Sequence, residues 1–236
     1  DTRVVGVDCS LDRLAVAKKT IRKYILEPRV DRGLKTHIQL YHNDGTQLGR
    51  QPANLVFDSN VAWKQRQILG ERKHVNKAAR RHEQQHLEKI TSSLDEPFDL
   101  VLVDAECSTD GSMKHVRKAL RDDVVRGTMK ALCDDGESIK LQNLQRNLLA
   151  SGFRLLKPGG TLVYSTCSMS KTQNEDIVEW LLREQSKAEL VSVVLDGGRG
   201  KEGLIKGTVR FVPELGSSSA EFSGGGFFIA KMIKKD

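Results

Sequence analysis

Cysteine is scarce in this sequence. Only four occur in 236 residues, Cys9, Cys107, Cys133 and Cys167, and no two of them form a close C-x-x-C pair. Scattered cysteines of this kind argue against a disulfide framework and against a compact zinc knuckle, and they indicate a reducing compartment. The sequence also lacks a Walker-type phosphate loop and a G-x-S-x-G elbow. Nucleotide triphosphate chemistry and Ser-His-Asp hydrolysis are therefore not indicated.

Long apolar runs are absent as well. No run approaches the roughly 20 residues that span a bilayer, and the start, Asp1-Thr2-Arg3, resembles neither a signal peptide nor a complete transit peptide. With 38% hydrophobic residues the chain can bury one good core, so we expect a single soluble, intracellular domain over 1–236. The net charge of +7 favours a polyanionic partner such as RNA or DNA.

Three predicted strands each end on an acidic residue or are followed by a turn that contains one. The strands cover residues 3–8, 36–42 and 98–104, and the acids are Asp8, Asp44 and Asp104. In an open parallel sheet, ligands bind in the crevice beyond the carboxyl ends of the strands. The pattern therefore places the three carboxylates at a candidate binding edge.

Strand and helix patterns alternate along the chain. Apolar residues at helical spacing predict helices over 11–25, 138–156 and 172–185, and further strands are predicted over 161–166, 190–195 and 226–233. This alternation predicts an α/β fold with a doubly wound sheet, in which the later strands are antiparallel.

The segment at about 51–94 is long, polar and rich in charge. It is predicted to be a basic insertion, either a solvated projecting segment or an arm that contacts RNA. It contains His82-Glu83-Gln84-Gln85-His86, which matches the H-E-x-x-H pattern of zinc metalloproteases. A catalytic zinc also needs a third protein ligand and a dry, supported helix, which the charged flanks do not favour, so no metal site is assigned.

Two of the four cysteines follow predicted strands. Cys167 comes directly after the strand over 161–166, and Cys107 comes three residues after Asp104. An unpaired cysteine is commonly a small buried apolar residue. The repeated placement also fits a pair of reactive thiols, and position alone leaves both interpretations open.

Short motifs follow one another along the whole chain. They are Val7-Asp8-Cys9-Ser10 with Arg13-Leu14, Asn43-Asp44-Gly45, residues 103–108, residues 155–168, Gln173-Asn174-Glu175, residues 210–213 and residues 226–231. In this order they resemble the motifs of the Sun-type (RsmB-like, Nol/Nop/Sun) family of S-adenosylmethionine-dependent RNA 5-methylcytosine methyltransferases. Cys107-Ser108-Thr109-Asp110 looks closest to the mitochondrial branch of that family.

The resemblance implies a Rossmann-like methyltransferase fold and a reaction that moves a methyl group from S-adenosylmethionine to carbon 5 of cytosine in rRNA or tRNA. It implies that Cys167 is the nucleophile, that Asp104 contacts the base, and that Cys107 assists release of the methylated RNA. The cofactor-binding residues it implies are Asp8, Arg13, Asp44 and Asp104. It further implies an RNA partner, no membrane, a protein partner for RNA targeting, and a mitochondrial, nucleolar or cytoplasmic location.

Two features depart from the family pattern. Glu106 stands where the family has proline before the first cysteine. In addition, the family's first, central strand and its glycine-rich loop precede the motif at Asp8, so we expect a segment of a longer protein and weak cofactor binding by the isolated chain. Two alternatives stay open: a catalytically degenerate member that binds RNA or a partner, and a basic RNA-binding module that works through the segment at about 51–94.

Overall fold

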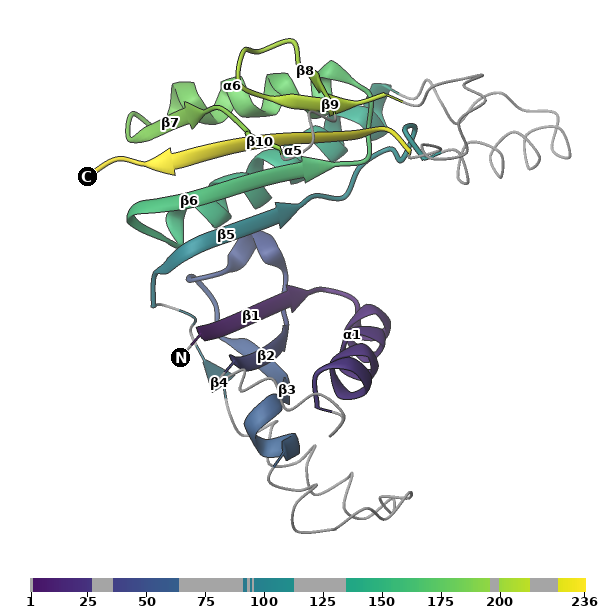
Figure 1. Cartoon of the computed structure of the whole chain (residues 1–236), viewed down its shortest axis with the longest axis vertical. Coiled ribbons are helices and arrows are strands. Elements are labelled where there is room, and N and C mark those ends of the chain that lie inside the picture. The colour runs from purple at the N-terminus through teal and green to yellow at the C-terminus, as the bar shows by residue number, and fades with distance from the viewer. Residues whose placement is uncertain are drawn as a thin grey trace, which may run out of the picture. The chain divides into compact units, whose positions relative to one another are not determined.

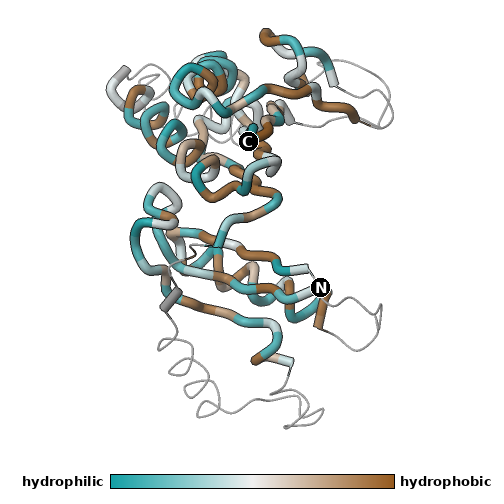
Figure 2. The backbone as a smooth tube through the Cα atoms, turned by 90° about the vertical axis from the view of Figure 1, so that its left-hand side faces the viewer, coloured by the Kyte–Doolittle hydropathy of each residue, from teal (hydrophilic) through white to brown (hydrophobic). Residues whose placement is uncertain are grey.

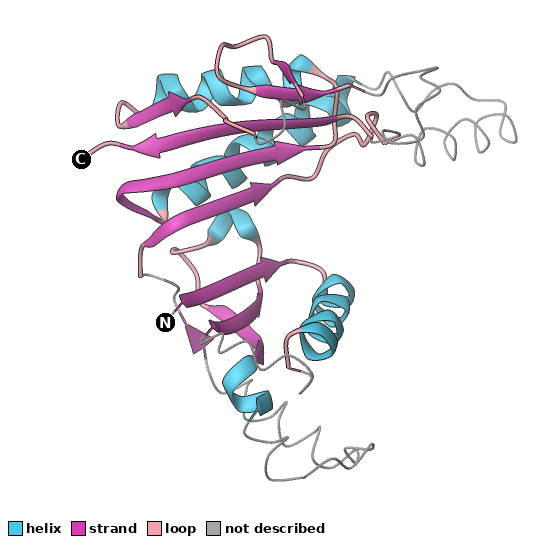
Figure 3. Cartoon of the chain, in the orientation of Figure 1, coloured by secondary structure: helices cyan, strands magenta, loops and turns pink. Residues whose placement is uncertain are grey.

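The computed structural model describes residues 2–26, 36–63, 91–92, 94, 96–112, 135–195, 200–212 and 225–236. Contacts divide the chain into two compact units, Asp1–Asp95 and Glu96–Asp236, and each unit is described by itself. Figure 1 labels the helices and strands, and Figure 3 colours them by type.

The first unit is built on a four-stranded sheet with the order β1-β2-β3-β4. The strands are β1 (Thr2–Asp8), β2 (Thr36–His42), β3 (Ala53–Asp58) and β4 (Thr91–Ser92). Strands β1 and β2 are parallel, with Asp8 opposite His42, whereas β3 is antiparallel to both β2 and β4. The carboxyl ends of β1 and β2 therefore meet at one edge, as the sequence pattern predicts.

Helix α1 (Leu11–Tyr24) follows β1 after a short turn. Ser10 caps it, because the Ser10 hydroxyl accepts a hydrogen bond from the backbone N–H of Arg13 at 3.3 Å. Leu14 is buried and packs in one cluster with Leu40 of β2 and Phe57 of β3. This contact fixes the helix on the sheet beside the end of β1.

Strand β3 lies inside the segment at about 51–94, for which no strand was predicted. Its Leu55 and Phe57 are 3% and 0% exposed, so the first residues of that segment belong to the core of the unit. The basic block and the His82–His86 motif fall in residues 64–90, outside the described residues.

The second unit contains a six-stranded sheet with the order β5-β6-β10-β9-β8, and β7 also pairs with β10. The strands are β5 (Phe98–Asp104), β6 (Leu156–Thr166), β7 (Ala188–Val191), β8 (Lys201–Glu202), β9 (Val209–Phe211) and β10 (Phe227–Lys234). Strands β5 and β6 are parallel, with Asp104 opposite Ser165, and β10 is antiparallel to β6. The later strands are therefore antiparallel, as predicted.

Two helices of this unit, α5 (Asp135–Arg154) and α6 (Glu175–Glu184), lie on the same face of the sheet (Figure 1). Both alternate hydrophilic and hydrophobic residues, as helices that cover a sheet do (Figure 2). Their apolar sides and the inward side chains of β6 and β10 form one core, which includes Leu149, Phe153, Leu162, Tyr164, Ile177, Leu181, Phe228 and Met232. Burying these side chains supplies the main stabilisation, at roughly 1.5–3 kcal/mol for each large one.

Short 3₁₀ turns follow two of the strands in the chain. They are η1 (Gly45–Gln47), just after the acid that follows β2, and η3 (Lys171–Gln173), between β6 and α6. Within the described residues, no helix combines the length and the apolar character needed to cross a membrane.

Candidate active site

In the first unit, Asp8 lies at the carboxyl end of β1 and is fixed by two neighbours. Its Oδ1 accepts hydrogen bonds from the backbone N–H of Ser10 at 2.7 Å and from Nε of Arg13 at 3.0 Å. The pKa of Arg13 is raised by its hydrogen bond to Asp8 and by the charge of that carboxylate. Arg13 thus orients Asp8, and the two residues form one unit of the candidate site.

Asp44 lies at the same edge, beyond β2. Its Oδ1 accepts the backbone N–H and the hydroxyl of Thr46, at 2.9 and 2.8 Å. The backbone N–H of Asn43 donates to the carbonyl oxygen of Asp8 at 3.3 Å, which ties the turns after β1 and β2 together. Among the described residues, both hydrogen bonds that the Asp44 carboxylate accepts use Oδ1. Oδ2 can therefore accept a hydrogen bond from an amino group.

In the second unit, Asp104 lies at the carboxyl end of β5. The hydroxyl of Ser165, which is opposite in β6, donates to Asp104 Oδ1 at 3.0 Å, and the backbone N–H of Ala105 donates to the Ser165 carbonyl at 3.0 Å. The side chain of Ser165 is buried, whereas Asp104 is exposed. Oδ1 is therefore held from within the sheet on an otherwise exposed carboxylate.

The two cysteines that follow these strands lie in contact. Cys107 Sγ and Cys167 Sγ are 2.9 Å apart, and both residues are partly exposed. Burial, the hydrogen bond between the two thiols and the negative charges of Cys107 and Asp104 raise the pKa of Cys167 to about 12. Cys167 is therefore a thiol at neutral pH in this arrangement, and it must lose its proton in order to act as a nucleophile.

The loop that carries Cys107 is anchored by two buried glutamines. Gln145 of α5 donates from Nε2 to the carbonyl of Glu106 at 2.8 Å, and Gln173 accepts the backbone N–H of Ser108 at 3.0 Å. The Glu106 side chain itself is exposed. A side-chain contact from α5 thus holds the backbone at the position where the family has proline.

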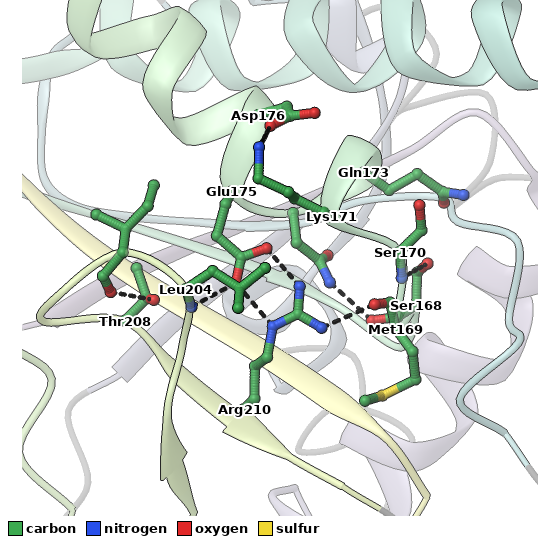
Figure 4. A network of polar contacts seen from close by, with 12 residues as sticks. Ser168, Met169, Ser170, Lys171, Gln173, Glu175, Asp176, Leu204, Thr208 and Arg210 are labelled. Carbon is green, nitrogen blue, oxygen red and sulfur yellow. Dashed lines mark hydrogen bonds and ion pairs between the residues drawn. The ribbon is translucent and has the colours of Figure 1, made fainter.

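The turn after Cys167 is anchored by a buried ion pair (Figure 4). Arg210 Nη1 donates to the Met169 carbonyl at 2.7 Å, and Arg210 Nε donates to Glu175 at 2.7 Å. Glu175 also accepts the backbone N–H of Leu204 at 3.1 Å. Burial alone would raise the pKa of Glu175, but these hydrogen bonds outweigh it and lower the pKa. Glu175 therefore stays ionised and keeps Arg210 aimed at the turn.

Gly111 lies where the two cysteine loops cross. Its N–H donates to the Cys167 carbonyl at 3.0 Å, and its own carbonyl accepts the N–H of Gly226. A Cβ at this position would come within 2.5 Å of the Cys167 carbonyl oxygen and 2.9 Å of Gly226 Cα. These are backbone atoms, so a side chain here forces the loops apart.

We expect Gly111→Ala to destabilise the protein by about 1–3 kcal/mol, because it overpacks this crossing. The measurement is the urea midpoint of unfolding. Gly136→Ala is the matched control, since Gly136 is exposed in α5 and alanine is the better helix former there. Equal midpoints for the two variants contradict the close approach.

Most of the chain matches one known protein family. The family model of the 16S rRNA methyltransferase RsmB/F matches residues 61–233, more than half of the chain. The chain belongs to the RsmB/F family. Members of this family are RNA methyltransferases that use S-adenosylmethionine, and the Sun-type resemblance is confirmed.

Curated relatives within the RsmB/F family cover part of the chain. The ribosomal RNA small subunit methyltransferase F of Klebsiella pneumoniae is 30% identical over 145 residues, which are 61% of this chain and 27% of the relative. The protein of the same name from Shewanella oneidensis is 35% identical over 142 residues, 59% of this chain and 26% of the relative. The chain thus spans about a quarter of the length of these relatives.

Solved structures confirm the Rossmann-like methyltransferase fold of this RsmB/F chain. NSun6 from Pyrococcus horikoshii, determined with SFG, has a TM-score of 0.59 at 19% identity and covers 99% of this chain and 42% of its own. A methyltransferase homologue from the same organism has a TM-score of 0.57 at 21% identity, over 99% of this chain and 54% of its own. At these identities the likeness concerns the fold.

The structure groups the predicted site residues of this RsmB/F chain into two sets. In the first unit Asp8 contacts Arg13 and Asp44 lies at the same edge of the sheet, and in the second Cys107 contacts Cys167 near Asp104. The residues that hold the cysteine loops had no predicted role. Three of them, Gln173, Glu175 and Arg210, belong to motifs found in the sequence. Gln145 could be recognised only as a polar residue on a helix expected to be buried.

Proposed function

We propose that this chain carries the catalytic centre of an enzyme that transfers a methyl group from S-adenosylmethionine to carbon 5 of cytosine in rRNA or tRNA, through a covalent cysteine–cytosine adduct. The observation that carries the proposal is the pair of thiols, Cys107 and Cys167, with 2.9 Å between their sulfur atoms. They follow adjacent parallel strands, and the carboxylate of Asp104 ends one of those strands. Membership of the RsmB/F family supports RNA as the substrate.

The chemistry explains why two thiols are useful. Carbon 5 of cytosine is a poor nucleophile. Cys167 gives its thiol proton to water, and addition of the resulting thiolate to carbon 6 makes the ring an enamine. Carbon 5 then takes the methyl group from the sulfonium, which leaves as S-adenosylhomocysteine. Loss of the proton from carbon 5 expels the Cys167 thiolate and restores the ring. Cys107 lies beside Cys167, and its thiolate is proposed to accept that proton.

Asp104 is proposed to act on ring nitrogen 3. Negative charge develops there when the thiolate adds, and a carboxyl group that shares its proton with nitrogen 3 stabilises it. The bond from Ser165 engages Oδ1 and leaves Oδ2 for the base. Ser165 therefore sets the orientation in which Asp104 would meet the base.

Binding of the nucleoside part of S-adenosylmethionine is proposed for residues of the first unit. Asp8, oriented by Arg13, is proposed to accept bonds from the ribose hydroxyls, and Asp44 Oδ2 a bond from the adenine amino group. Acceptor groups at the carboxyl ends of two parallel strands fit a nucleoside. When bound, this cofactor supplies the electrophilic methyl group.

A second candidate is a catalytically degenerate member that binds RNA or a partner protein without methyl transfer. Glu106 in place of proline favours it, because a charged residue stands next to Cys107. A mitochondrial location and a protein partner for RNA targeting stay predictions.

The test is the identity of the product. Full-length protein is incubated with labelled S-adenosylmethionine and ribosomal or transfer RNA, and the digested RNA is compared with nucleoside standards by mass spectrometry. We expect label only in 5-methylcytidine. Label in another methylated nucleoside contradicts the proposal, and RNA binding without label supports the degenerate member.

A further inference from the structure

Asp110 contacts both loops that carry the candidate catalytic thiols. One oxygen of its carboxylate accepts the hydroxyl of Ser108, the residue after Cys107, and the other accepts the backbone N–H of Met169 at 3.1 Å, two residues after Cys167. The side chain is half-buried. One carboxylate thus joins the two loops through separate oxygens.

The turn after Cys167 is also held from its own side. Asn174 donates to the Ser168 carbonyl at 2.9 Å, and Arg210 donates to the Met169 carbonyl at 2.7 Å. These bonds fix the turn to β9 and to Asn174, the residue before α6. Gln173, next to Asn174, also holds the Cys107 loop, and the direct contacts between the two loops add to this shared anchor.

Neutral groups make the other direct hydrogen bonds between the loops. The Ser108 and Ser168 hydroxyl oxygens are 3.1 Å apart, and the Gly111 N–H donates to the Cys167 carbonyl at 3.0 Å. Hydrogen bonds to an ionised acceptor are roughly twice as strong as neutral ones. Burial raises the pKa of Asp110, but hydrogen bonds from Ser108, Ser168 and the Met169 backbone outweigh it and lower the pKa. Asp110 is therefore the charged link between the loops at neutral pH.

We propose that Asp110 is a positioning residue that holds the Cys107 and Cys167 thiols at the mutual distance their reaction requires. The inference rests on the proposed function, in which one thiol adds to carbon 6 and the other removes a proton from the neighbouring carbon 5. Two groups that act on adjacent atoms must be placed together, and a misplacement of about 1 Å can lower a rate about 10²-fold. Asp110 does not itself touch the base.

The distance between the thiols can be read without any methyl transfer. Diamide oxidises two neighbouring thiols to a disulfide and is itself reduced to the hydrazine, and peptide mapping under non-reducing conditions identifies the Cys107–Cys167 link. Asp110→Asn keeps the size of the side chain but removes its charge and one acceptor. We expect this variant to form the disulfide at least about fivefold more slowly than the natural protein.

Asp99→Asn is the matched control, because Asp99 is an exposed aspartate of the same unit that pairs only with Lys157 among the described residues. It should form the disulfide at the natural rate. Circular dichroism shows whether each variant is folded, and Ser108→Ala, which removes the hydroxyl bound by Asp110, provides a second variant. A folded Asp110→Asn or Ser108→Ala protein that cross-links at the natural rate overturns the proposal.

Methyl transfer gives an independent second readout. A positioning role predicts that Asp110→Asn lowers kcat about tenfold and leaves the KM for S-adenosylmethionine within about twofold, because the residue acts after binding. If the natural protein transfers no methyl group to cytosine, the proposed function fails, while the cross-linking rates still test the role of Asp110. Unchanged kcat together with unchanged cross-linking rejects that role alone.

Discussion

Replacement of Cys167 by alanine is expected to abolish methyl transfer, by roughly 10³-fold or more, because the reaction then lacks the thiolate that activates carbon 5. The side chain is small and partly exposed, so its truncation should leave the fold intact. The measurement is transfer of labelled methyl groups to RNA, with the unfolding midpoint followed in parallel. Full transfer by Cys167→Ala contradicts the assignment of the nucleophile.

Replacement of Cys107 gives the complementary result. If Cys107 removes the proton from carbon 5, Cys107→Ala should complete the attack but release the product slowly, so an RNA–protein adduct that survives denaturant should accumulate. The double variant Cys107→Ala, Cys167→Ala should form no adduct. Cys9→Ala is the cysteine control, since this exposed thiol lies in the first unit, and it should still transfer methyl groups. An adduct that persists in the double variant assigns the attack to another residue.

Arg210→Met is expected to destabilise the protein by about 3–5 kcal/mol, the usual cost of leaving one charge of a buried pair without its partner. Glu175 is 0% exposed and Arg210 is largely buried, and methionine keeps most of the packing against Phe228. The variant should also release the Met169 carbonyl and so loosen the turn after Cys167. Chemical denaturation measures the change.

Two comparisons separate this effect from a loss of surface charge. Lys157→Met removes one partner of an exposed pair with Asp99, and such pairs are worth about 0–1 kcal/mol. The double variant Arg210→Met, Glu175→Met should recover part of the stability, because no buried charge is left without a partner. If Arg210→Met behaves like Lys157→Met, the ion pair does not anchor the turn.

Much of the fold follows from local patterns in the sequence. Strand β2 alternates with period two, α1 begins at Leu11, and β5 ends on Asp104, and each is found where it was predicted. These signals lie within a few neighbouring residues, so no knowledge of distant contacts is needed. The same holds for the placement of Asp104 at the end of β5 and of Cys107 and Cys167 just beyond the ends of β5 and β6, while their chemical roles came from the resemblance and stay predictions.

Other features depend on contacts between residues far apart in the chain. Gln173 meets Ser108 across 65 residues, and Gln145 meets Glu106 across 39. In the sequence, such a glutamine can be recognised only as a polar residue. Its hydrogen-bond partner can be identified only once the positions of the loops are known. Strand β3 was missed for a related reason, because its six residues precede a long charged stretch that dominates the composition of that region.

The pairing of Asp104 with Ser165 has a consequence for how this protein can change in evolution. Side chains alternate between the faces of a strand. The gain or loss of one residue in the regularly paired stretches 100–104 of β5 or 161–165 of β6 would therefore turn the following side chains to the opposite face. The Cys107 and Cys167 thiols would then no longer lie in contact. Insertions and deletions can therefore accumulate in the connecting segments of this unit. Within the paired stretches of these two strands, evolution can substitute residues but rarely insert or delete them.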